Sequence, residues 1–231
     1  LFTATSFAGS GANLTGVGGA TSINGLSDAV TSDSNNIGLG SGAVDSITTG
    51  DANTGVGINS LTANTSGQLN TAVGFEALAT NTTGQRLTAV GKSALQNSTG
   101  SFNTAVGSVA LENNTSGAQN SAVGDYALNS NTTGGFNTAM GQGGLLSNTT
   151  GQYNTALGCN SLQSNTTANS NTSGGYNSML TNTTGYSNTG FGIYTLRQNT
   201  TGTNNVALGQ SALLNNTTAT LNVSIGYNSM Y

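Results

Sequence analysis

A 17-residue repeat runs through most of this sequence and constrains its fold more than any other feature. Each copy contains a motif of the type Asn-Thr-Ala-Val-Gly. The closing glycines recur with a 17-residue spacing, except for a single 16-residue step between Gly91 and Gly107. The twelve glycines are Gly40, Gly57, Gly74, Gly91, Gly107, Gly124, Gly141, Gly158, Gly175, Gly192, Gly209 and Gly226. A fixed period of this length is typical of a solenoid, in which each repeat forms one coil that is stabilised by its neighbours.

The residues within each repeat favour strands and turns over helices. A large apolar residue precedes the motif glycine, and a second one, usually Leu, follows it by four residues. An Asn-Thr-Thr-Gly type of turn comes next. Frequent Gly, Asn and Thr disfavour a helix, whereas short apolar segments between glycine-containing turns are typical of strands. The sequence therefore predicts an all-β parallel β-solenoid, of the β-roll or β-helix type, with two short strands in each 17-residue coil.

Stacking of such coils places identical repeat positions in columns about 4.8 Å apart. We expect two apolar columns to form the interior, one containing Val73, Val90, Val106 and Val123 and the other containing Leu78, Leu95, Leu111 and Leu128. The small residues between them, mostly Ala, would allow the two walls of the coil to approach closely. The asparagine that opens each motif would form amide ladders along the axis.

The repeat divides the chain into two parts. Residues 1–35 depart from the pattern and are interpreted as an N-terminal cap or junction, because solenoids need atypical ends. Residues 36–231 form an array of twelve repeats, the last of them truncated. No comparable cap follows the array, and an unpaired strand edge is a template for another subunit. We therefore expect a homomeric fibre, formed by parallel trimerisation or by end-to-end stacking.

The composition argues against several classes of function. Only 4% of residues are charged, and the cations are Arg86, Lys92 and Arg197, so we expect no nucleic-acid binding. No apolar run approaches the roughly 20 residues of a membrane span, so we expect no membrane insertion. The chain contains no His and a single cysteine, Cys159, which excludes His-dependent nucleophilic sites and structural zinc. We expect no enzymatic activity, no catalytic, cofactor-binding or metal-binding residues, and no cofactor other than covalent glycans.

The Asn-Thr-Thr turn matches the acceptor pattern for N-glycosylation, Asn followed by any residue except Pro and then Ser or Thr. The candidate sites are Asn64, Asn81, Asn97, Asn114, Asn131, Asn148, Asn165, Asn182, Asn199 and Asn216. All ten keep a hydroxyl at the third position, and glycans on one edge would hydrate a chain that is poor in charge. A second interpretation stays open, in which Asn and Thr simply stabilise a turn by bonding the local backbone.

The motif Asn-Thr-Ala-Val-Gly, as at residues 70–74 and 103–107, resembles the repeat in the head domains of trimeric autotransporter adhesins. The whole 17-residue unit is similar to repeat arrays in tail-fibre-like proteins of environmental bacteriophages. Residues 3–16 and 26–30 are similar to segments that precede such arrays. The first resemblance implies left-handed parallel β-rolls assembled as homotrimers.

These observations together favour a structural subunit of an extracellular or virion fibre or filament, an adhesin-like shaft. Its partners would be further copies of itself and a cell-surface or glycan receptor, and its location extracellular or on a virion surface. The alternative is an ice-binding or flat-surface-binding solenoid that uses columns of threonine. One such column contains Thr71, Thr88, Thr104, Thr138, Thr155, Thr172 and Thr189, and the other contains Thr82, Thr132, Thr149, Thr166, Thr183 and Thr200.

Overall fold

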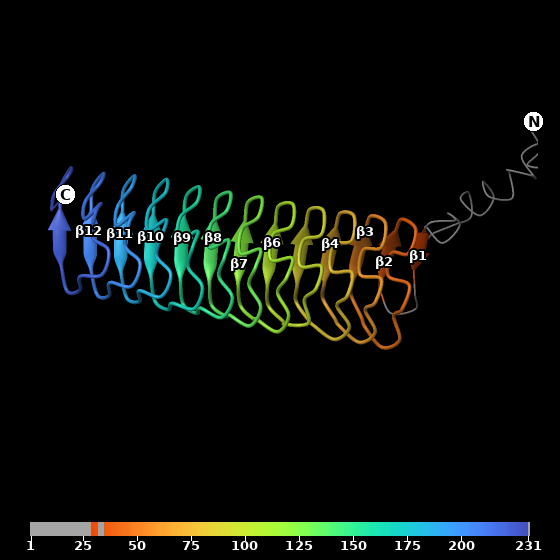
Figure 1. Ribbon diagram of the computed structural model, residues 1–231. Coiled ribbons are helices and arrows are strands. Elements are labelled where there is room, and N and C mark those ends of the chain that lie inside the picture. The colour runs from red at the N-terminus through yellow and green to blue at the C-terminus, as the bar shows by residue number, and fades with distance from the viewer. Residues whose placement is uncertain (1–28, 32–34, 231) are drawn as a thin grey trace, which may run out of the picture.

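The computed structural model describes residues 29–31 and 35–230, and this part of the chain forms a rod of stacked coils (Figure 1). Thirteen strands of three residues each lie side by side in one sheet, in chain order along the rod. The strands are β1 (Ala29–Thr31), β2 (Ile37–Leu39), β3 (Thr54–Val56), β4 (Thr71–Val73), β5 (Thr88–Val90), β6 (Thr104–Val106), β7 (Ser121–Val123), β8 (Thr138–Met140), β9 (Thr155–Leu157), β10 (Thr172–Gly174), β11 (Thr189–Phe191), β12 (Val206–Leu208) and β13 (Val223–Ile225). The described residues contain no helix.

The twelve strands β2 to β13 pair in parallel and in register, one strand to each repeat. Ala72, for example, pairs with Ala89, which pairs with Ala105 across the single 16-residue step. The predicted parallel β-solenoid with one coil per repeat is therefore confirmed. We number the positions of a repeat from 1, the asparagine before each strand, so that the motif glycine is position 5 and the buried leucine is position 9.

Each coil contains one strand and not the two that we expected. Beyond the motif glycine the backbone enters left-handed conformations at positions 7 and 9, as at Tyr126 (φ 58°) and Leu128 (φ 52°). The Tyr126 N–H donates to Ser108 O in the preceding coil, whereas the Leu128 N–H donates to Gly144 O in the following one. The segment from position 7 to position 9 is therefore hydrogen-bonded to both neighbouring coils. It is not a second regular strand, because residues with positive φ lie outside the β region.

The motif glycine makes close stacking of the coils feasible. Gly124 has φ of +133°, and a Cβ atom there would lie only 2.7 Å from the carbonyl carbon of Gly141 in the next coil. Only glycine combines this backbone conformation with this close approach. The steric requirement repeats at each motif glycine from Gly40 to Gly209, and this is why glycine is the most regular feature of the sequence.

The interior of the rod is a thin column of leucine and alanine. The leucine column at position 9 is buried as expected, with Leu78, Leu95, Leu111 and Leu128 fully inaccessible. Facing it is the middle residue of each strand, position 3, which is usually Ala. Position 8 adds a second small residue, so the two walls of the coil approach closely as the sequence analysis predicted.

The valine column at position 4 lies outside the coil, and its prediction as an interior column is wrong. Val73, Val90, Val106 and Val123 have exposed fractions of 37%, 37%, 37% and 39%. Successive residues of a strand point to opposite faces, so the buried asparagine at position 1 places position 3 inside and positions 2 and 4 outside. Alanine is therefore the core residue of the strand, although valine is the larger one.

Two buried asparagine ladders run along the rod, which confirms the predicted amide ladders. At position 1, the Asn137 N–H donates to Asn120 Oδ1 (2.9 Å), and Asn137 Nδ2 donates to Gly151 O (2.8 Å). At position 12, Asn131 Nδ2 donates to Asn114 Oδ1 (2.7 Å) and to Gly134 O (2.9 Å). Every buried side-chain nitrogen and oxygen of the described residues has a partner, so the polar interior is fully satisfied.

The strand β1 pairs antiparallel along the outer edge of β2, with Val30 opposite Gly38. It belongs to the segment 1–35 that the sequence analysis interpreted as a cap, and it occupies the strand edge at that end of the sheet. The remainder of this segment, residues 1–28 and 32–34, lies outside the described residues.

Candidate functional site

The most distinctive surface of the rod is the outward side of its sheet, which we call the sheet face: the side chains at positions 2 and 4 of β2 to β13. Position 2 contributes a column of mostly threonine, and position 4 contributes an adjacent apolar column. The column at position 2 consists of Ile37, Thr54, Thr71, Thr88, Thr104, Ser121, Thr138, Thr155, Thr172, Thr189, Val206 and Val223. The column at position 4 consists of Leu39, Val56, Val73, Val90, Val106, Val123, Met140, Leu157, Gly174, Phe191, Leu208 and Ile225.

Apolar and aromatic side chains also line both flanks of the sheet face, at positions 16 and 17 before the strand and 6 and 7 after it. These exposed flanking residues are Ile58, Leu69, Phe75, Phe102, Tyr126, Phe136, Tyr153, Tyr176, Tyr186, Ile193, Leu221 and Tyr227. Phe136 and Tyr153 stack with ring centroids 5.0 Å apart. Apart from Met230, all exposed large hydrophobic residues in the described part of the chain lie on the sheet face or its flanks.

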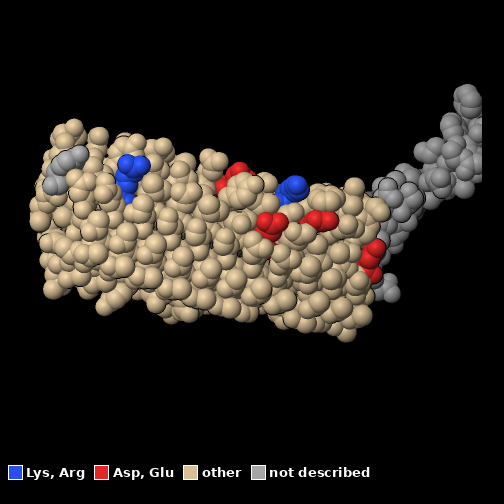
Figure 2. All heavy atoms as spheres, in the orientation of Figure 1, with Lys and Arg blue, Asp and Glu red and all other residues tan. Residues whose placement is uncertain are grey.

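Charge is absent from the sheet face. None of the strands β2 to β13 contains a charged residue. Five charged residues lie on the flanks of the sheet face, namely Asp51, Glu76, Arg86, Lys92 and Asp125. On the side drawn in Figure 2 charged side chains are few and are spread along most of the length of the rod. Arg86 lies over the ring of Phe102, with 5.7 Å between its Cζ atom and the ring centroid, and Arg197 lies over Tyr194 at 5.1 Å.

The apolar column at position 4 contains one glycine, Gly174, and an apolar side chain covers the surface there as well. A Cβ atom at Gly174 would lie 2.6 Å from Cε1 of Phe191 in the next coil, so the phenyl ring covers the glycine. The column therefore keeps its hydrophobic character while its shape varies from coil to coil.

The structure places eight of the ten candidate glycosylation sites inside the coil. These residues are fully buried: Asn64, Asn81, Asn114, Asn131, Asn148, Asn165, Asn182 and Asn199. Asn216 is partly buried, and its Nδ2 donates to Asn199 Oδ1 (2.8 Å). Asn97 is exposed, because its coil is one residue shorter and Ser98 takes the position 12 place, accepting a hydrogen bond from Asn114 Nδ2 (3.0 Å).

This placement does not fit the expected row of glycans, one per coil along an exposed edge. N-glycosylation joins the sugar to the Asn side-chain nitrogen, and in eight of these residues that atom donates within a buried ladder. The second interpretation, in which these asparagines stabilise the turn by bonding the local backbone, accounts for their burial. The hydroxyl kept at the third position of the pattern has no explanation in the structure. Glycosylation stays a prediction for Asn97, the candidate asparagine that is exposed.

The two threonine columns of the alternative hypothesis differ in their surroundings. The hydroxyls of the position 2 threonines, such as Thr104 and Thr138, point outward and make no hydrogen bond within the described part of the chain. In the second column, at position 13, the hydroxyls bond along the rod, and Thr149 Oγ1 donates to Thr166 O (3.0 Å). The first column thus presents a row of hydroxyl groups that the described part of the protein does not use, whereas in the second column this holds for Thr82 alone.

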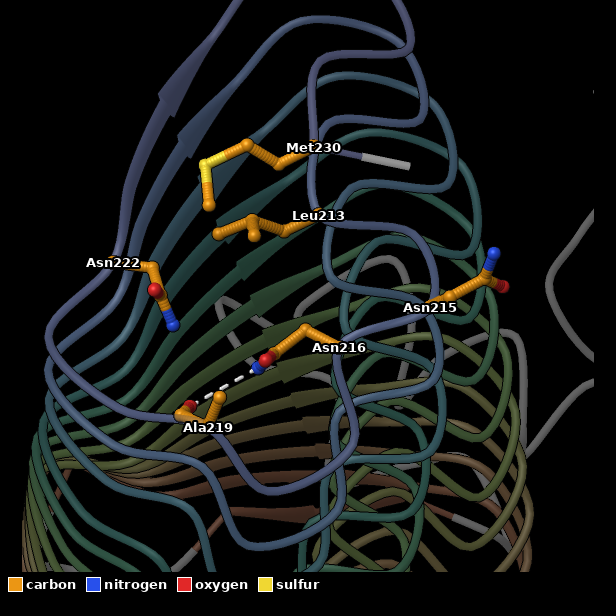
Figure 3. A pocket seen from close by; sticks show the side chains of 6 residues that line it. All are labelled: Leu213, Asn215, Asn216, Ala219, Asn222 and Met230. Atoms are coloured by element: carbon orange, nitrogen blue, oxygen red, sulfur yellow. Dashed lines mark hydrogen bonds between the residues drawn. The ribbon is translucent and has the colours of Figure 1, made fainter.

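The final coil leaves part of the interior open, as Figure 3 shows. A cavity of about 250 Å³ is lined by Leu213, Asn215, Asn216, Ala219, Asn222 and Met230. Leu213 and Met230 lie side by side in it, as two members of the position 9 column, and Asn216 Nδ2 donates to Ala219 O at 3.2 Å. The cavity is the end of the core column and has no charged residue in its lining.

The acidic side chains and the cysteine of the described residues are spread over several coils. Glu76 and Glu112 have separate partners, as Glu76 accepts from Gln96 Nε2 (2.8 Å) and Glu112 from Asn129 Nδ2 (3.0 Å). Cys159 is a free thiol at position 6, on the flank of the sheet face. Across the described ranges, no three His, Cys, Asp or Glu side chains gather as metal ligands. Nor does this part of the chain contain a helix of the length and hydropathy required to cross a membrane.

Sequence reasoning missed the sheet face, because it assigned the valine column to the interior. The signal that could have found it is the alternation around each strand: a buried asparagine and alanine two residues apart leave threonine and valine outside. Comparisons of the chain with protein-family models, with curated proteins and with solved structures found no match.

Proposed function

We propose that this protein is a non-catalytic structural subunit of a fibre or filament, in which the solenoid serves as a rigid shaft. The observation that carries the proposal is the unbroken register of parallel strands from β2 to β13. Each inner coil is bonded to both neighbours through its strand and its turns, and two amide ladders add further bonds along the rod, with an interruption in the coil of residues 87–102. Such a rod keeps its two ends a fixed distance apart.

The length of the shaft follows from the number of coils. Eleven parallel strand pairings join β2 to β13, and at about 4.8 Å per pairing they span roughly 53 Å. The proposal places the protein outside the cell or on a virion surface, where a surface of hydroxyl, amide and apolar groups serves attachment. Further copies of the chain are the expected partners, and a cell-surface or glycan receptor is the expected target.

Deletion of two whole repeats tests the shaft. Removal of residues 137–170 joins Phe136 to Asn171 and keeps the repeat in register. We expect the shortened chain to fold and small-angle X-ray scattering to show a rod shorter by about 10 Å than the parent. A compact particle for the parent, or loss of folding on this in-register deletion, contradicts the proposal.

A second function, binding to ice or another flat ordered surface, is favoured by one observation. From β3 to β11, the position 2 hydroxyls point outward once per coil and are unused by the described part of the protein. Thermal hysteresis of the purified chain tests this function, and substitution of Thr104, Thr138 and Thr155 by valine should abolish it. Absence of thermal hysteresis in the parent chain leaves the shaft as the sole proposal.

A further inference from the structure

The exposed apolar residues of the rod gather on a single side. Monomeric proteins rarely expose contiguous apolar patches larger than a few hundred Å², and larger patches mark interaction sites. In this chain the patch follows the position 4 column along the described length. Apolar residues at positions 6 and 17 widen it in about half of the coils, whereas Lys92, Asp125 and Arg86 occupy these positions in others. The opposite edge, with its Asn-Thr-Thr turns, carries no exposed large hydrophobic residue in the described coils.

The dimensions of this patch match a protein interface. The described strands span roughly 53 Å along the rod, and five residues from position 17 to position 4 cover about 16 Å across it. The product is about 850 Å². This is close to the roughly 800 Å² that each partner contributes to an interface of standard size.

A second copy of this chain fits the sheet face best. Positions 2 and 4 carry no charge, and the five charged residues on the flanks are of both signs, so two copies meet with little repulsion between like charges. Two surfaces with the same period of one coil also match along their entire length, and the free position 2 hydroxyls gain hydrogen-bond partners. A flat crystalline surface fits less well, because the side chains of the position 4 column differ in size from coil to coil, as in the series Val123, Met140, Leu157, Gly174 and Phe191.

Association side by side also fits the ends of the rod better than end-to-end stacking. The strand β1 already occupies the outer edge of β2. A copy that approached this end would have to displace it before strands could pair. The sheet face, in contrast, is accessible along the described coils.

We propose that two copies of the chain pack through their sheet faces with their long axes aligned, burying the valine and threonine columns. This inference names the partner of the shaft and therefore rests on the proposed function. The test compares the parent chain with two triple variants by sedimentation equilibrium at micromolar concentration, with reductant present because Cys159 lies on the flank.

The first variant combines Val90→Lys, Val106→Lys and Val123→Lys on the sheet face, where all three side chains are exposed in the single chain. The second combines Thr133→Lys, Thr150→Lys and Thr167→Lys on the opposite edge, also in three successive coils and also exposed. Both place three lysines at the same spacing, so their effects on the single rod are matched. Circular dichroism confirms that both variants are folded.

We expect the parent and the Thr variant to sediment at twice the 22.8 kDa of one chain or a higher multiple. The Val variant should sediment as a single chain, with its dissociation constant raised by about 100-fold or more, because lysines would be desolvated in the interface. A parent of 22.8 kDa, or equal masses for the two variants, overturns the pairing. Electron microscopy separates the two proposals: single long rods overturn only the pairing, whereas compact particles overturn the shaft as well.

Discussion

Small side chains decide which residues of the coil are inside. Ala139 in strand β8 and Gly144 at position 8 leave just enough room for one leucine, Leu145, which fills the interior of its coil. The next residue, Leu146, is only partly buried. Two adjacent leucines thus have opposite roles, and the difference is set by the backbone alone.

Replacement of these two leucines measures the contribution of the core column. Leu145→Ala should lower the free energy of unfolding by about 2–4 kcal/mol, because it leaves a cavity in a coil whose interior holds no other large apolar side chain. Leu146→Ala removes the same atoms from a partly exposed position and should cost about 1 kcal/mol or less. Urea denaturation of the two variants makes the comparison, and equal losses would contradict the assignment of position 9 to the core.

The amide ladder at position 12 should contribute as much as the leucine column. Asn131→Ala removes two donated hydrogen bonds and the one accepted from Asn148 Nδ2 (2.8 Å), and it leaves buried partners unsatisfied. We expect a loss of about 2–4 kcal/mol in the free energy of unfolding. The exposed Asn97 is the control, and Asn97→Ala should change stability by about 0.5 kcal/mol or less. A tolerated Asn131→Ala would show that the ladder is not a stabilising feature.

The same geometry limits glycosylation. In a host that attaches N-glycans, we expect at most one site to be modified, Asn97, because the other asparagines are held in the ladder or beside it. Intact-mass measurement of the native protein, followed by peptide mapping, gives the number and position of glycans. Sugar on any of the eight buried asparagines would mean that those coils are not folded as described.

The alternation of buried and exposed positions in each strand could have been predicted from the sequence. The valine at position 4 was assigned to the core instead, because it is a large apolar residue. Valine is a typical core residue, whereas alanine and asparagine are not obvious partners for it. The leucine column and the amide ladders were predicted correctly, because each is required at the same place in nearly every coil. The burial of the Asn-Thr-Thr asparagines could not be derived, since the sequence pattern of a glycan acceptor and of this turn are identical.

At the scale of the coil, residues 87–102 differ from the other repeats. Leu87 replaces the asparagine of position 1, Ser98 replaces that of position 12, and the turn is one residue shorter. Both amide ladders are therefore interrupted in one coil, although the strand pairing of β5 with β6 continues. Leu87 is fully buried and fills the space of the missing amide.

This coil should be the weakest point in the interior of the rod. Loss of two ladder amides removes hydrogen bonds of about 1 kcal/mol each, so local opening should be about tenfold or more frequent there. Hydrogen exchange followed by mass spectrometry should show faster exchange in residues 87–102 than in residues 120–136. Equal protection in the two coils would contradict this expectation.

The sequence predicted the number, order and pairing of the coils but not the number of strands in each. The period alone determines the stacking, because identical positions must come together. The second expected strand, around position 9, is replaced by turns that alternate their hydrogen bonds between the two neighbouring coils. Leucine seldom adopts a left-handed conformation, so the residues at positions 7 and 9 gave no indication of it.

At the scale of the whole molecule, the rod is polar on one edge and apolar on its sheet face. Only 4% of its residues are charged, so hydroxyl and amide groups supply most of its hydration. Such a rod is poorly suited to exist alone at high concentration, and pairing through the sheet face removes its apolar side from water. The shaft and the pairing together describe a fibre in which the solenoid axis is the fibre axis.

X-ray diffraction from oriented fibres of the native material tests this claim most directly. Coils stacked along the fibre axis predict a strong reflection at about 4.8 Å on the meridian, the spacing between hydrogen-bonded strands. A reflection of this spacing on the equator, or none at all, would contradict a fibre built from rods aligned along its axis.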